Sequence, residues 1–547
     1  MSASIIAIIS IVLFLVAYFV YSKKLERDWG IDDSKVTPAH RLQDGIDYVP
    51  AKAPVLLGHH FASIAGAAPI VGPIAASVFG WVPVLLWILI GNIFFGAVKD
   101  FGALFASIRH DSKSIGEIIQ KNLGDTGKIL FNLFAWLTLL LVVAAFAVIT
   151  AKTFVSVPAA ASSSLMFIVL AVVFGFAVYR SNVPMSIGTV IGVVLLFVCV
   201  YLGLLFPVQL SFTTWVYILL AYIFVASITP VWILLQPRDY LNSFLLYAIL
   251  AGAVIGLFVS SPTIVLSSYT GFKASIGYMF PVLFVTVACG AISGFHSLVS
   301  SGTTSKQLDK ESDARIIGYG GMLIEGVLAV LALITAAVLA GDKLGELLKA
   351  GGPVAVFSHS VGNFLGAIGI PPAAGTSFAA LAVSAFALTS LDTATRLGRF
   401  IFQELMEMGS GNKGTNNGDT WGSKIIATGV TVVAGGALAL SGKWSAIWPI
   451  FGSANQLLAA LALLAISVWL ANIGKNNKAT LIPMLFMFAV TLTALVTLVT
   501  KNLGAGNILL AVIGAILFCL AIVLGIFGYR VLSNLKETVD VDPTLKQ

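Results

Sequence analysis

Charged residues are scarce in this chain. Asp, Glu, Lys and Arg make up 10% of its 547 residues, whereas soluble domains carry about 25%. Hydrophobic residues make up 58%, and the mean hydropathy is +0.99. A water-soluble fold has too little interior to bury this much apolar surface, so the solvent must be a lipid bilayer. This composition excludes a soluble enzyme, a nucleic-acid-binding protein and a disordered scaffold.

Cysteine is also rare. Cys199, Cys289 and Cys519 lie far apart within apolar runs, a pattern that gives neither a disulfide framework nor a zinc-binding spacing. The sequence contains no Walker phosphate-binding loop and no nucleophile elbow. We therefore expect no enzymatic activity, no cofactor and no hydrolysis of ATP by this chain.

Long apolar runs fill most of the sequence. A helix needs about 20 residues to cross the hydrocarbon core of a bilayer, and runs of that length recur between glycine, proline and charged breaks. The sequence predicts an all-α polytopic membrane protein with about fifteen transmembrane helices. The predicted spans are 4–21, 56–79, 82–108, 127–155, 162–180, 185–207, 213–235, 243–262, 277–300, 314–340, 373–403, 424–442, 447–471, 480–500 and 506–530.

The distribution of lysine and arginine predicts the orientation. With residues 22–55 in the cytoplasm, 24 of the 31 basic residues fall on the cytoplasmic side, six fall outside, and Lys99 lies within a span. Membrane proteins retain positive charge on the cytoplasmic side, so we expect the N-terminus outside and the C-terminus inside, in a cell (inner) membrane. We interpret segment 341–372 as an outer-face loop with an interfacial or re-entrant helix.

Two predicted spans are interrupted at mid-depth. The second contains Gly58 to Pro73 and the ninth contains Ala288 to His296, both rich in small residues and both with histidine near the inner end. They are seven spans apart, so they run in opposite directions across the bilayer. We predict a five-plus-five inverted repeat of spans 2–6 and 9–13, with two discontinuous helices at matching positions. Close packing of helices is the alternative explanation for such small residues.

This repeat divides the chain into six segments. They are a transmembrane helix with a cytoplasmic loop (1–55), inverted repeat 1 (56–207), two linking helices (208–276), inverted repeat 2 (277–475), two C-terminal helices (476–530) and a cytoplasmic tail (531–547).

Eight ordered motifs are specific enough to compare with known families. They are residues 40–50, 58–61, 230–232, 236–241, 288–306 (ACGAISGFHSLVSSGTTSK), 317–320, 389–396 and 451–457. Together they resemble the carbon starvation protein A family of bacterial and archaeal inner-membrane transporters, over most of residues 40–475. The resemblance implies an architecture similar to the amino acid–polyamine–cation superfamily. It also implies peptide uptake during starvation or, as in some members, proton-coupled pyruvate uptake.

The breaks are the expected binding site. A half-helix that begins inside the membrane directs a partial positive charge at the cavity, which favours a carboxylate, while unwound carbonyls favour a cation. Asn455 and Gln456 are adjacent amides on the thirteenth span, where one of them can reach substrate and the other can bond a neighbouring helix. The predicted substrate-binding residues are Ala65, Gly66, Ala67, Gly290, Ser293, Gly294, Asn455 and Gln456.

Ionisable residues inside spans indicate coupling sites, because charge in lipid is costly. Glu325 lies about eleven residues into the tenth span, and His59, His60 and His296 lie at the inner ends of the interrupted spans. Burial favours the neutral form of a carboxyl, and histidine changes charge near neutral pH. These four residues favour a proton as the coupling ion. Structural hydrogen bonds are the alternative role for each of them.

Sodium is the competing coupling ion. Thr389 and Ser390 lie on the eleventh span, and the resemblance to the superfamily implies that paired hydroxyls there ligate sodium together with span-two carbonyls. Asp392 is a further candidate for ion coupling. It lies four residues before Arg396 on the same helix face, so an ion pair between them is the alternative.

Two other charged pairs receive structural interpretations. Lys99 and Asp100 lie within the third span, where the lysine side chain can extend towards the inner interface. Arg238 and Asp239 are expected in a short inner loop after Pro237, as a pair that stabilises the fold.

The sequence thus predicts a secondary-active symporter for a small carboxylate-bearing nutrient, a peptide or pyruvate, with alternating access around two broken helices. Its partners are that substrate and the lipid bilayer, without nucleic acid, and the oligomeric state is not determined. A channel is one alternative. A membrane enzyme with His59, His60, His296 and Glu325 at a metal site is another.

Overall fold

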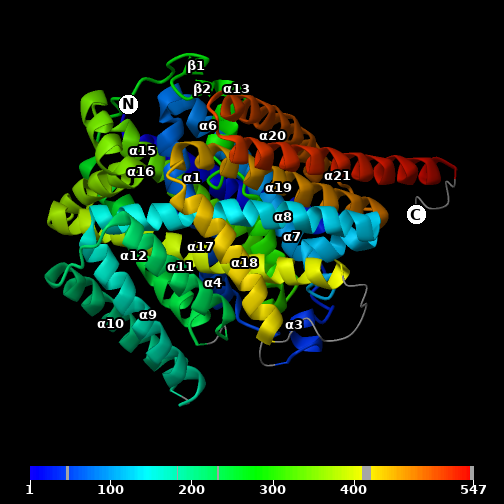
Figure 1. The fold of residues 1–547 in the computed structure, drawn as a ribbon, viewed down its shortest axis with the longest axis horizontal. Coiled ribbons are helices and arrows are strands. Elements are labelled where there is room, and N and C mark those ends of the chain that lie inside the picture. The colour runs from blue at the N-terminus through cyan, green and yellow to red at the C-terminus, as the bar shows by residue number, and fades with distance from the viewer. Residues whose placement is uncertain (45–47, 182, 231–232, 410–420, 542–547) are drawn as a thin grey trace.

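The chain is built almost entirely of helices, as the computed structural model in Figure 1 shows. The structure describes residues 1–44, 48–181, 183–230, 233–409 and 421–541. Parts of the motifs at 40–50 and 230–232, and the end of the predicted tail 531–547, lie outside these described residues.

The first half of the chain contains both short and long helices, with π-helical or 3-10 turns inside or after several of them. In order they are α1 (Ala3–Val16), η1 (Ala17–Tyr21), α2 (Ser22–Trp29), α3 (Pro38–Arg41), α4 (Ala53–Ile64), α5 (Ala68–Ala76), η2 (Ser77–Phe79), α6 (Trp81–Gly91), η3 (Asn92–Gly96), α7 (Ala97–Ile108), α8 (Ile115–Ser156), α9 (Pro158–Tyr179), α10 (Met185–Leu205), α11 (Phe212–Ile228) and α12 (Leu235–Ser260).

The second half begins with a small antiparallel hairpin and continues with helices. In order they are β1 (Lys273–Ala274), β2 (Gly277–Tyr278), α13 (Met279–Thr286), α14 (Gly294–Gly302), η4 (Thr304–Gln307), η5 (Arg315–Gly320), α15 (Gly321–Ala337), α16 (Gly341–Gly366), α17 (Pro372–Gly409), α18 (Trp421–Leu440), α19 (Trp444–Asn472), α20 (Lys478–Gly504) and α21 (Ile508–Val541).

The predicted apolar spans coincide with these helices. Among the described residues, 12 helices are long and apolar enough to cross a membrane, or 13 when the bent pair α4 and α5 counts as one span. The predicted span 213–235 is the shorter helix α11, and 277–300 is the interrupted pair α13 and α14. The chain is therefore a multi-pass membrane protein, while the count of fifteen spans and the inverted repeat stay predictions.

Two predicted boundaries near Pro230 are wrong. The sequence predicted one span over 213–235 and the next from residue 243, but α11 ends at Ile228 and α12 begins at Leu235. Pro230 explains the early end, because a proline disfavours helical geometry at the residue before it. Arg238 and Asp239 therefore lie in the first turns of α12, and not in a loop.

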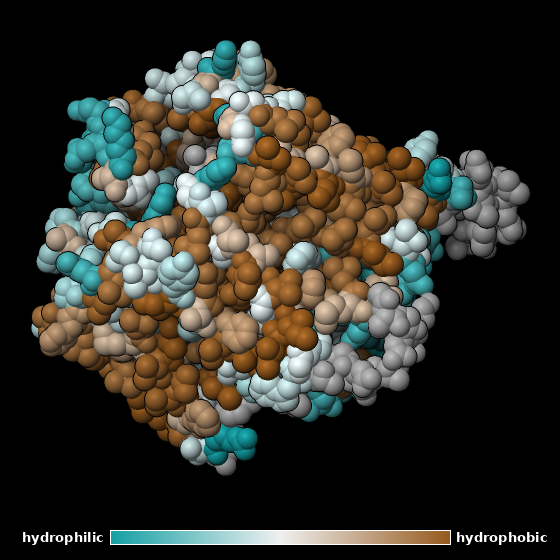
Figure 2. Space-filling model, viewed as in Figure 1, coloured by the Kyte–Doolittle hydropathy of each residue, from teal (hydrophilic) through white to brown (hydrophobic). Residues whose placement is uncertain are grey.

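Burial separates central from peripheral helices. Most residues of α8, α15, α17 and α19 are buried within the protein, whereas α10, α20 and α21 leave most of their apolar side chains at least partly exposed. Figure 2 shows this exposed apolar surface as a broad brown area, with hydrophilic residues gathered at its margins. Such a surface is stable only against lipid, so the peripheral helices are the ones that contact the bilayer.

Segment 341–372 forms α16, which is kinked at Gly352 and packs against α17. It is not among the described helices that are apolar enough to cross a membrane. This agrees with an outer-face segment that contains a helix, and the orientation of the whole chain stays a prediction.

Cysteine labelling tests that orientation. In a variant without the three native cysteines, single cysteines replace Ser34, Asp342 or Trp421, which are all exposed. An impermeant maleimide added to intact cells should label Asp342→Cys, and should label Ser34→Cys and Trp421→Cys only after permeabilisation. Outside labelling of Trp421→Cys would show that α16 crosses the membrane, and outside labelling of Ser34→Cys would reverse the predicted topology.

Candidate functional site

The first helix break lies between α4 and α5, which meet at an angle of 50°. Pro69 lacks a backbone N–H, and its ring clashes with the carbonyl four residues earlier, so a straight helix cannot continue through Ala65. Gly66 lies in the break, where the backbone N–H donates to the carbonyl of Ile64 over 2.8 Å. A Cβ at Gly66 would lie 2.6 Å from Oγ of Ser390, so α17 closes against this break.

The second break, at residues 287–293, separates α13 from α14 and is held by α19. Oδ1 of Asn455 accepts a hydrogen bond from the backbone N–H of Phe295 over 2.8 Å. Nε2 of Gln456 donates to the carbonyl of Phe284 over 2.5 Å. These bonds satisfy backbone groups that a continuous helix would satisfy itself. Both predicted amides therefore hold the second break, and their contact with substrate stays a prediction.

The two broken helices cross each other. α4 packs against α14 and α5 packs against α13. A Cβ at Gly72 of α5 would lie 2.6 Å from the carbonyl oxygen of Thr286 at the end of α13, so only glycine permits this close approach. The two predicted interruptions thus lie together in the middle of the molecule.

Four buried ionisable residues form a network beside the second break. Lys99 pairs with Asp100 and also donates to the carbonyl of Ser293. Oδ2 of Asp100 lies 2.9 Å from Nδ1 of His296, and Nε2 of His296 lies 3.4 Å from Oε2 of Glu325. All four side chains are 0% exposed. The prediction that Lys99 extends to the interface is wrong, because Asp100 and Ser293 provide its partners within the protein.

Glu325 is the member of this network whose carboxyl group has no hydrogen bond among the described residues. Neither oxygen of its carboxyl group has a hydrogen-bond partner among the described residues, and neither does Nε2 of His296. One ligand atom each from Cys289, His296 and Glu325 lie within 4.8 Å of one another. Such a group can exchange a proton, and its donor types also suit a metal ion.

The three predicted histidines do not form one cluster of contacts. His296 contacts Asp100 and Glu325, whereas Nδ1 of His60 hydrogen bonds to Oγ1 of Thr304 over 2.8 Å. His59 is buried, and its Nδ1 has no partner among the described residues. Sequence reasoning grouped His296 with Glu325, which the structure places in contact. It named Asp100 only beside Lys99 and gave it no part in this group, although a charged pair within an apolar span was a signal.

A second buried network lies beside the first break. Arg238 pairs with Asp392 and, over 3.2 Å, with Asp239, and the hydroxyl of Tyr222 donates to Asp392 over 2.7 Å. The alternative ion pair of Asp392 with Arg396 is wrong, because Arg396 instead donates to backbone carbonyls at the end of α11. Asp392 and Asp239 therefore share one arginine from α12.

The hydroxyls proposed for sodium lie between this network and the first break. Oγ1 of Thr389 accepts a hydrogen bond from Asn242 over 3.2 Å. Oγ of Ser390 faces Gly66 and has no hydrogen-bond partner among the described residues. Oγ of Ser63, one turn before the break, lies 3.5 Å from Oδ2 of Asp239. Oxygen atoms of this kind are ligands for hard cations.

A cavity of about 1010 Å³ lies above the crossing of the broken helices. Val71 and Ala75 of α5 and Val285 and Thr286 of α13 line its floor. None of the eight predicted substrate-binding residues belongs to its lining, because all of them are buried, six in or next to the breaks and two on α19. Their role in substrate binding stays a prediction.

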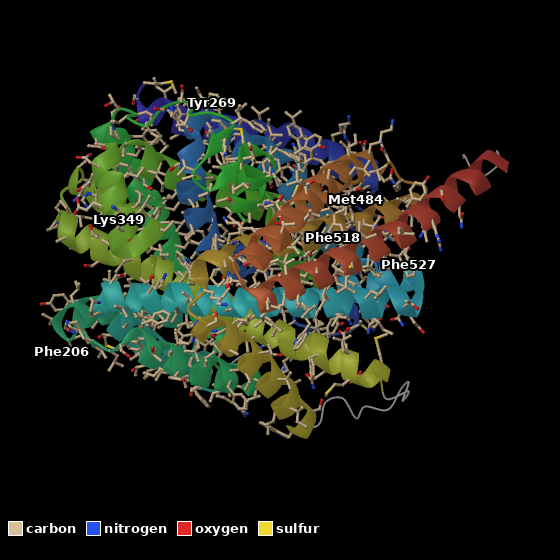
Figure 3. The ribbon with its side chains drawn as sticks, turned by 45° about the horizontal axis from the view of Figure 1, so that its top comes forward. Phe206, Tyr269, Lys349, Met484, Phe518 and Phe527 are labelled. Atoms are coloured by element: carbon tan, nitrogen blue, oxygen red, sulfur yellow. The ribbon has the colours of Figure 1, made fainter. Side chains whose placement is uncertain are left out.

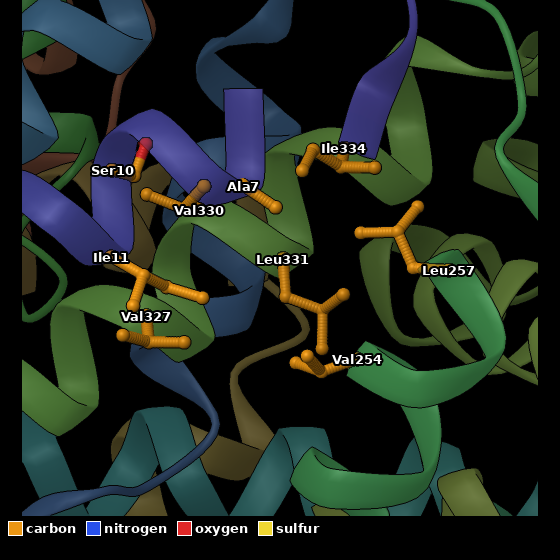
Figure 4. A pocket seen from close by; sticks show the side chains of 9 residues that line it. All are labelled: Ala7, Ser10, Ile11, Val254, Leu257, Val327, Val330, Leu331 and Ile334. Atoms are coloured by element: carbon orange, nitrogen blue, oxygen red, sulfur yellow. The ribbon is translucent and has the colours of Figure 1, made fainter. Parts of the chain in front are cut away.

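A second, much smaller cavity is excluded as a site. About 10 Å³ of space lies between α1, α12 and α15 (Figure 4), and its one polar side chain, Ser10, already donates to the carbonyl of Ile6 over 2.7 Å. The lining therefore offers a substrate neither room nor a free polar group.

Solved structures with a similar arrangement of helices define the fold. A crystal structure of a mutant manganese transporter from Eremococcus coleocola matches with a TM-score of 0.54 and 12% identity, over 90% of this chain and 99% of that one. The same transporter in complex with an aromatic bis-isothiourea compound gives 0.51 and 13%, with the same coverage. The protein therefore has the fold of a helical membrane transporter.

Sequence relatives define the family. The family described as carbon starvation protein CstA matches residues 2–347 and 340–494. The Escherichia coli K12 peptide transporter CstA is 33% identical over 89% of this chain and 80% of its own length, and the E. coli pyruvate/proton symporter BtsT is 33% identical over 90% and 81%. The chain belongs to the carbon starvation protein CstA family, which confirms the resemblance of its motifs.

Proposed function

We propose that this protein is a secondary-active symporter for uptake of a small carboxylate-bearing nutrient, a peptide or pyruvate, across the cell (inner) membrane. The observation that carries the proposal is the pair of crossed, broken helices with the buried carboxyl group of Glu325 beside them, which has no hydrogen bond among the described residues. The names of the relatives, peptide transporter and pyruvate/proton symporter, support the substrate class.

The breaks provide the substrate site of this mechanism. The half-helices α5 and α14 each begin inside the protein, so their N-terminal ends attract a carboxylate. The close contact of Gly66 with Ser390 shows that the first break is filled in this conformation. Substrate therefore enters when α17 moves away from α4 and α5, and alternating access is the motion of the two broken helices relative to α17 and α19.

Glu325 is the proton carrier of this mechanism. Burial away from water favours its neutral, protonated form. His296 offers Nε2 at 3.4 Å as the next proton acceptor, and Asp100 fixes the ring through Nδ1. Lys99 connects the network to the carbonyl of Ser293. A change of charge at Glu325 therefore alters the electrostatic interactions at the second break. In this way proton binding is coupled to the conformation of α13 and α14.

Proteoliposomes test the proposed function. Purified protein should accumulate labelled pyruvate or trialanine against its gradient when a pH gradient is imposed, and should show counterflow when preloaded with unlabelled substrate. Flux without counterflow would indicate a channel. Metal that copurifies with the protein, together with activity lost on chelation, would instead assign Cys289, His296 and Glu325 to a metal site.

Sodium coupling predicts a different result from the same vesicles. If sodium binds at the first break, Thr389→Ala and Ser390→Ala should each raise the sodium concentration for half-maximal uptake by about 5- to 150-fold, the equivalent of about 1–3 kcal/mol for one lost ligand. Ser384→Ala is the matched control, because Ser384 lies on the same helix and its hydroxyl donates to the carbonyl of Leu381, three residues earlier. Equal sodium dependence in all three variants would reject this site.

A further inference from the structure

The large cavity is built by helices from distant parts of the chain. Its floor is the crossing of α5 and α13, and its walls come from α8, α16, α19 and α20. In the predicted topology all of these contributions lie at the outer ends of their helices. The cavity thus leads from the outer face to the position immediately above the two helix breaks.

Among the described residues, three lysines and no acidic residue line this cavity. Lys152 comes from the outer end of α8, Lys349 from α16 and Lys501 from α20. All three are exposed, and none forms a salt bridge with a described residue. Figure 3 shows Lys349 on its helix, at the edge of the molecule. Their positive charges are therefore not neutralised by the protein.

The rest of the outer face does not neutralise this charge. The segments assigned to that face contain six basic residues and two carboxylates, Asp342 and Glu346. Glu346 already lies 3.0 Å from Nζ of Lys343. A cleft with charge of one sign and low-dielectric walls concentrates ions of the opposite sign. This face and its cavity therefore attract anions and repel cations.

Aromatic side chains form much of the remaining wall. Trp444, Trp448 and Phe280 line the cavity, and Nζ of Lys152 lies 5.5 Å from the centre of the Trp444 ring. Rigid aromatic surfaces next to a few cationic groups are typical of sites that bind amphipathic organic anions. The volume of about 1010 Å³ is at the upper end of the range for sites of drug-sized ligands, about 300–1,000 Å³. It is far larger than a molecule as small as pyruvate requires.

We propose that this cavity is a capture site for short anionic peptides, separate from the helix breaks, that selects acidic over basic peptides before transport. The proposal rests on the proposed function, namely uptake of a carboxylate-bearing nutrient. Lys152, Lys349 and Lys501 attract the carboxylates of the peptide, and the aromatic wall packs against its side chains. The floor formed by α5 and α13 then places the captured peptide next to the first break.

Binding of two matched tripeptides tests the capture site. Alanyl-glutamyl-alanine and alanyl-lysyl-alanine are titrated calorimetrically into the full-length protein in nanodiscs of zwitterionic lipid. The acidic peptide should bind at least about 10-fold more tightly, because it interacts favourably with three lysines while the basic peptide is repelled. Its affinity should fall as salt is raised, since exposed charges are screened.

Single and triple lysine variants locate the effect. Each single substitution, Lys152→Gln, Lys349→Gln or Lys501→Gln, should lower the binding affinity for the acidic peptide by about 2- to 5-fold. The triple variant should lower it by about 10-fold or more. Lys343→Gln is the matched control, because Lys343 lies on the same helix as Lys349 but outside the cavity and is paired with Glu346. It should leave the affinity within about 2-fold of the wild type.

The outcomes separate this proposal from the proposed function. Equal binding of the two peptides, or a triple variant that retains the preference for the acidic peptide, would overturn the capture site even if the protein transports peptides. Charge-selective binding that is lost in the triple variant would support it, and absence of uptake in proteoliposomes would then reject only the proposed function.

Discussion

Glu325→Gln should abolish uphill uptake driven by a pH gradient while substrate-for-substrate exchange stays measurable. Glutamine has nearly the same shape as the buried carboxyl group but cannot bind and release a proton. Loss of a positioned proton-transfer group typically costs about 10²- to 10⁴-fold in rate, so the driven component should fall by at least about 100-fold. Initial rates of labelled substrate uptake with and without a pH gradient measure it.

Two further variants sharpen this test. Glu346→Gln is the control, because Glu346 is an exposed carboxylate on α16 and should leave driven uptake near the wild-type rate. His296→Gln removes the nearest acceptor to Glu325 and should also lose driven uptake. Uptake that depends on sodium, is independent of pH and is unaffected by Glu325→Gln would overturn proton coupling at this position.

Arg238→Met should be among the most destabilising single substitutions in the protein. Arg238 is the partner of both Asp239 and Asp392, and all three side chains are nearly or fully buried. Removing one partner of a buried ion pair leaves an uncompensated charge and costs about 3–5 kcal/mol. Unfolding of the purified protein in SDS, followed by circular dichroism, measures the change in the free energy of unfolding.

Removal of the two acidic charges that pair with Arg238 should restore the stability of this variant. In Arg238→Met combined with Asp239→Asn and Asp392→Asn no charge remains in this network, so most of the lost stability should return. Arg41→Met is the control, because the ion pair of Arg41 with Asp111 is about half exposed and such pairs contribute about 0–1 kcal/mol. A single variant as stable as the wild type would show that the network does not hold α12 against α17.

Helix existence followed directly from the sequence. Hydrophobic run length sets whether a segment can cross a bilayer, and this quantity is local, so each predicted apolar segment coincides with a helix or a broken pair. The interruptions at Gly66 and between Ala288 and Ser293 were equally local, since proline and small residues fix where a helix cannot continue. The ends near Pro230 were misplaced, because apolar residues continue past the proline, and α8 begins at Ile115, earlier than the predicted residue 127.

The partners of the buried charged side chains could not be predicted from the sequence. Sequence spacing put Asp392 next to Arg396 on one helix face. Asp392 instead pairs with Arg238 of α12, 154 residues earlier in the chain. Lys99 likewise found partners in Asp100 and Ser293 and not at the interface. In a low-dielectric interior a charge is stable only beside its counter-charge, so packing between helices overrides the local spacing.

The sequence by itself determined that this is a membrane transporter of the carbon starvation protein CstA family, with two interrupted helices. It did so because hydropathy, proline chemistry and ordered motifs are properties of contiguous residues. Only the tertiary structure decided that His296 contacts Glu325 and Asp100, and that Lys152, Lys349 and Lys501 line one cavity. Those residues lie on separate helices, so their proximity depends on how the helices pack, which no local pattern encodes.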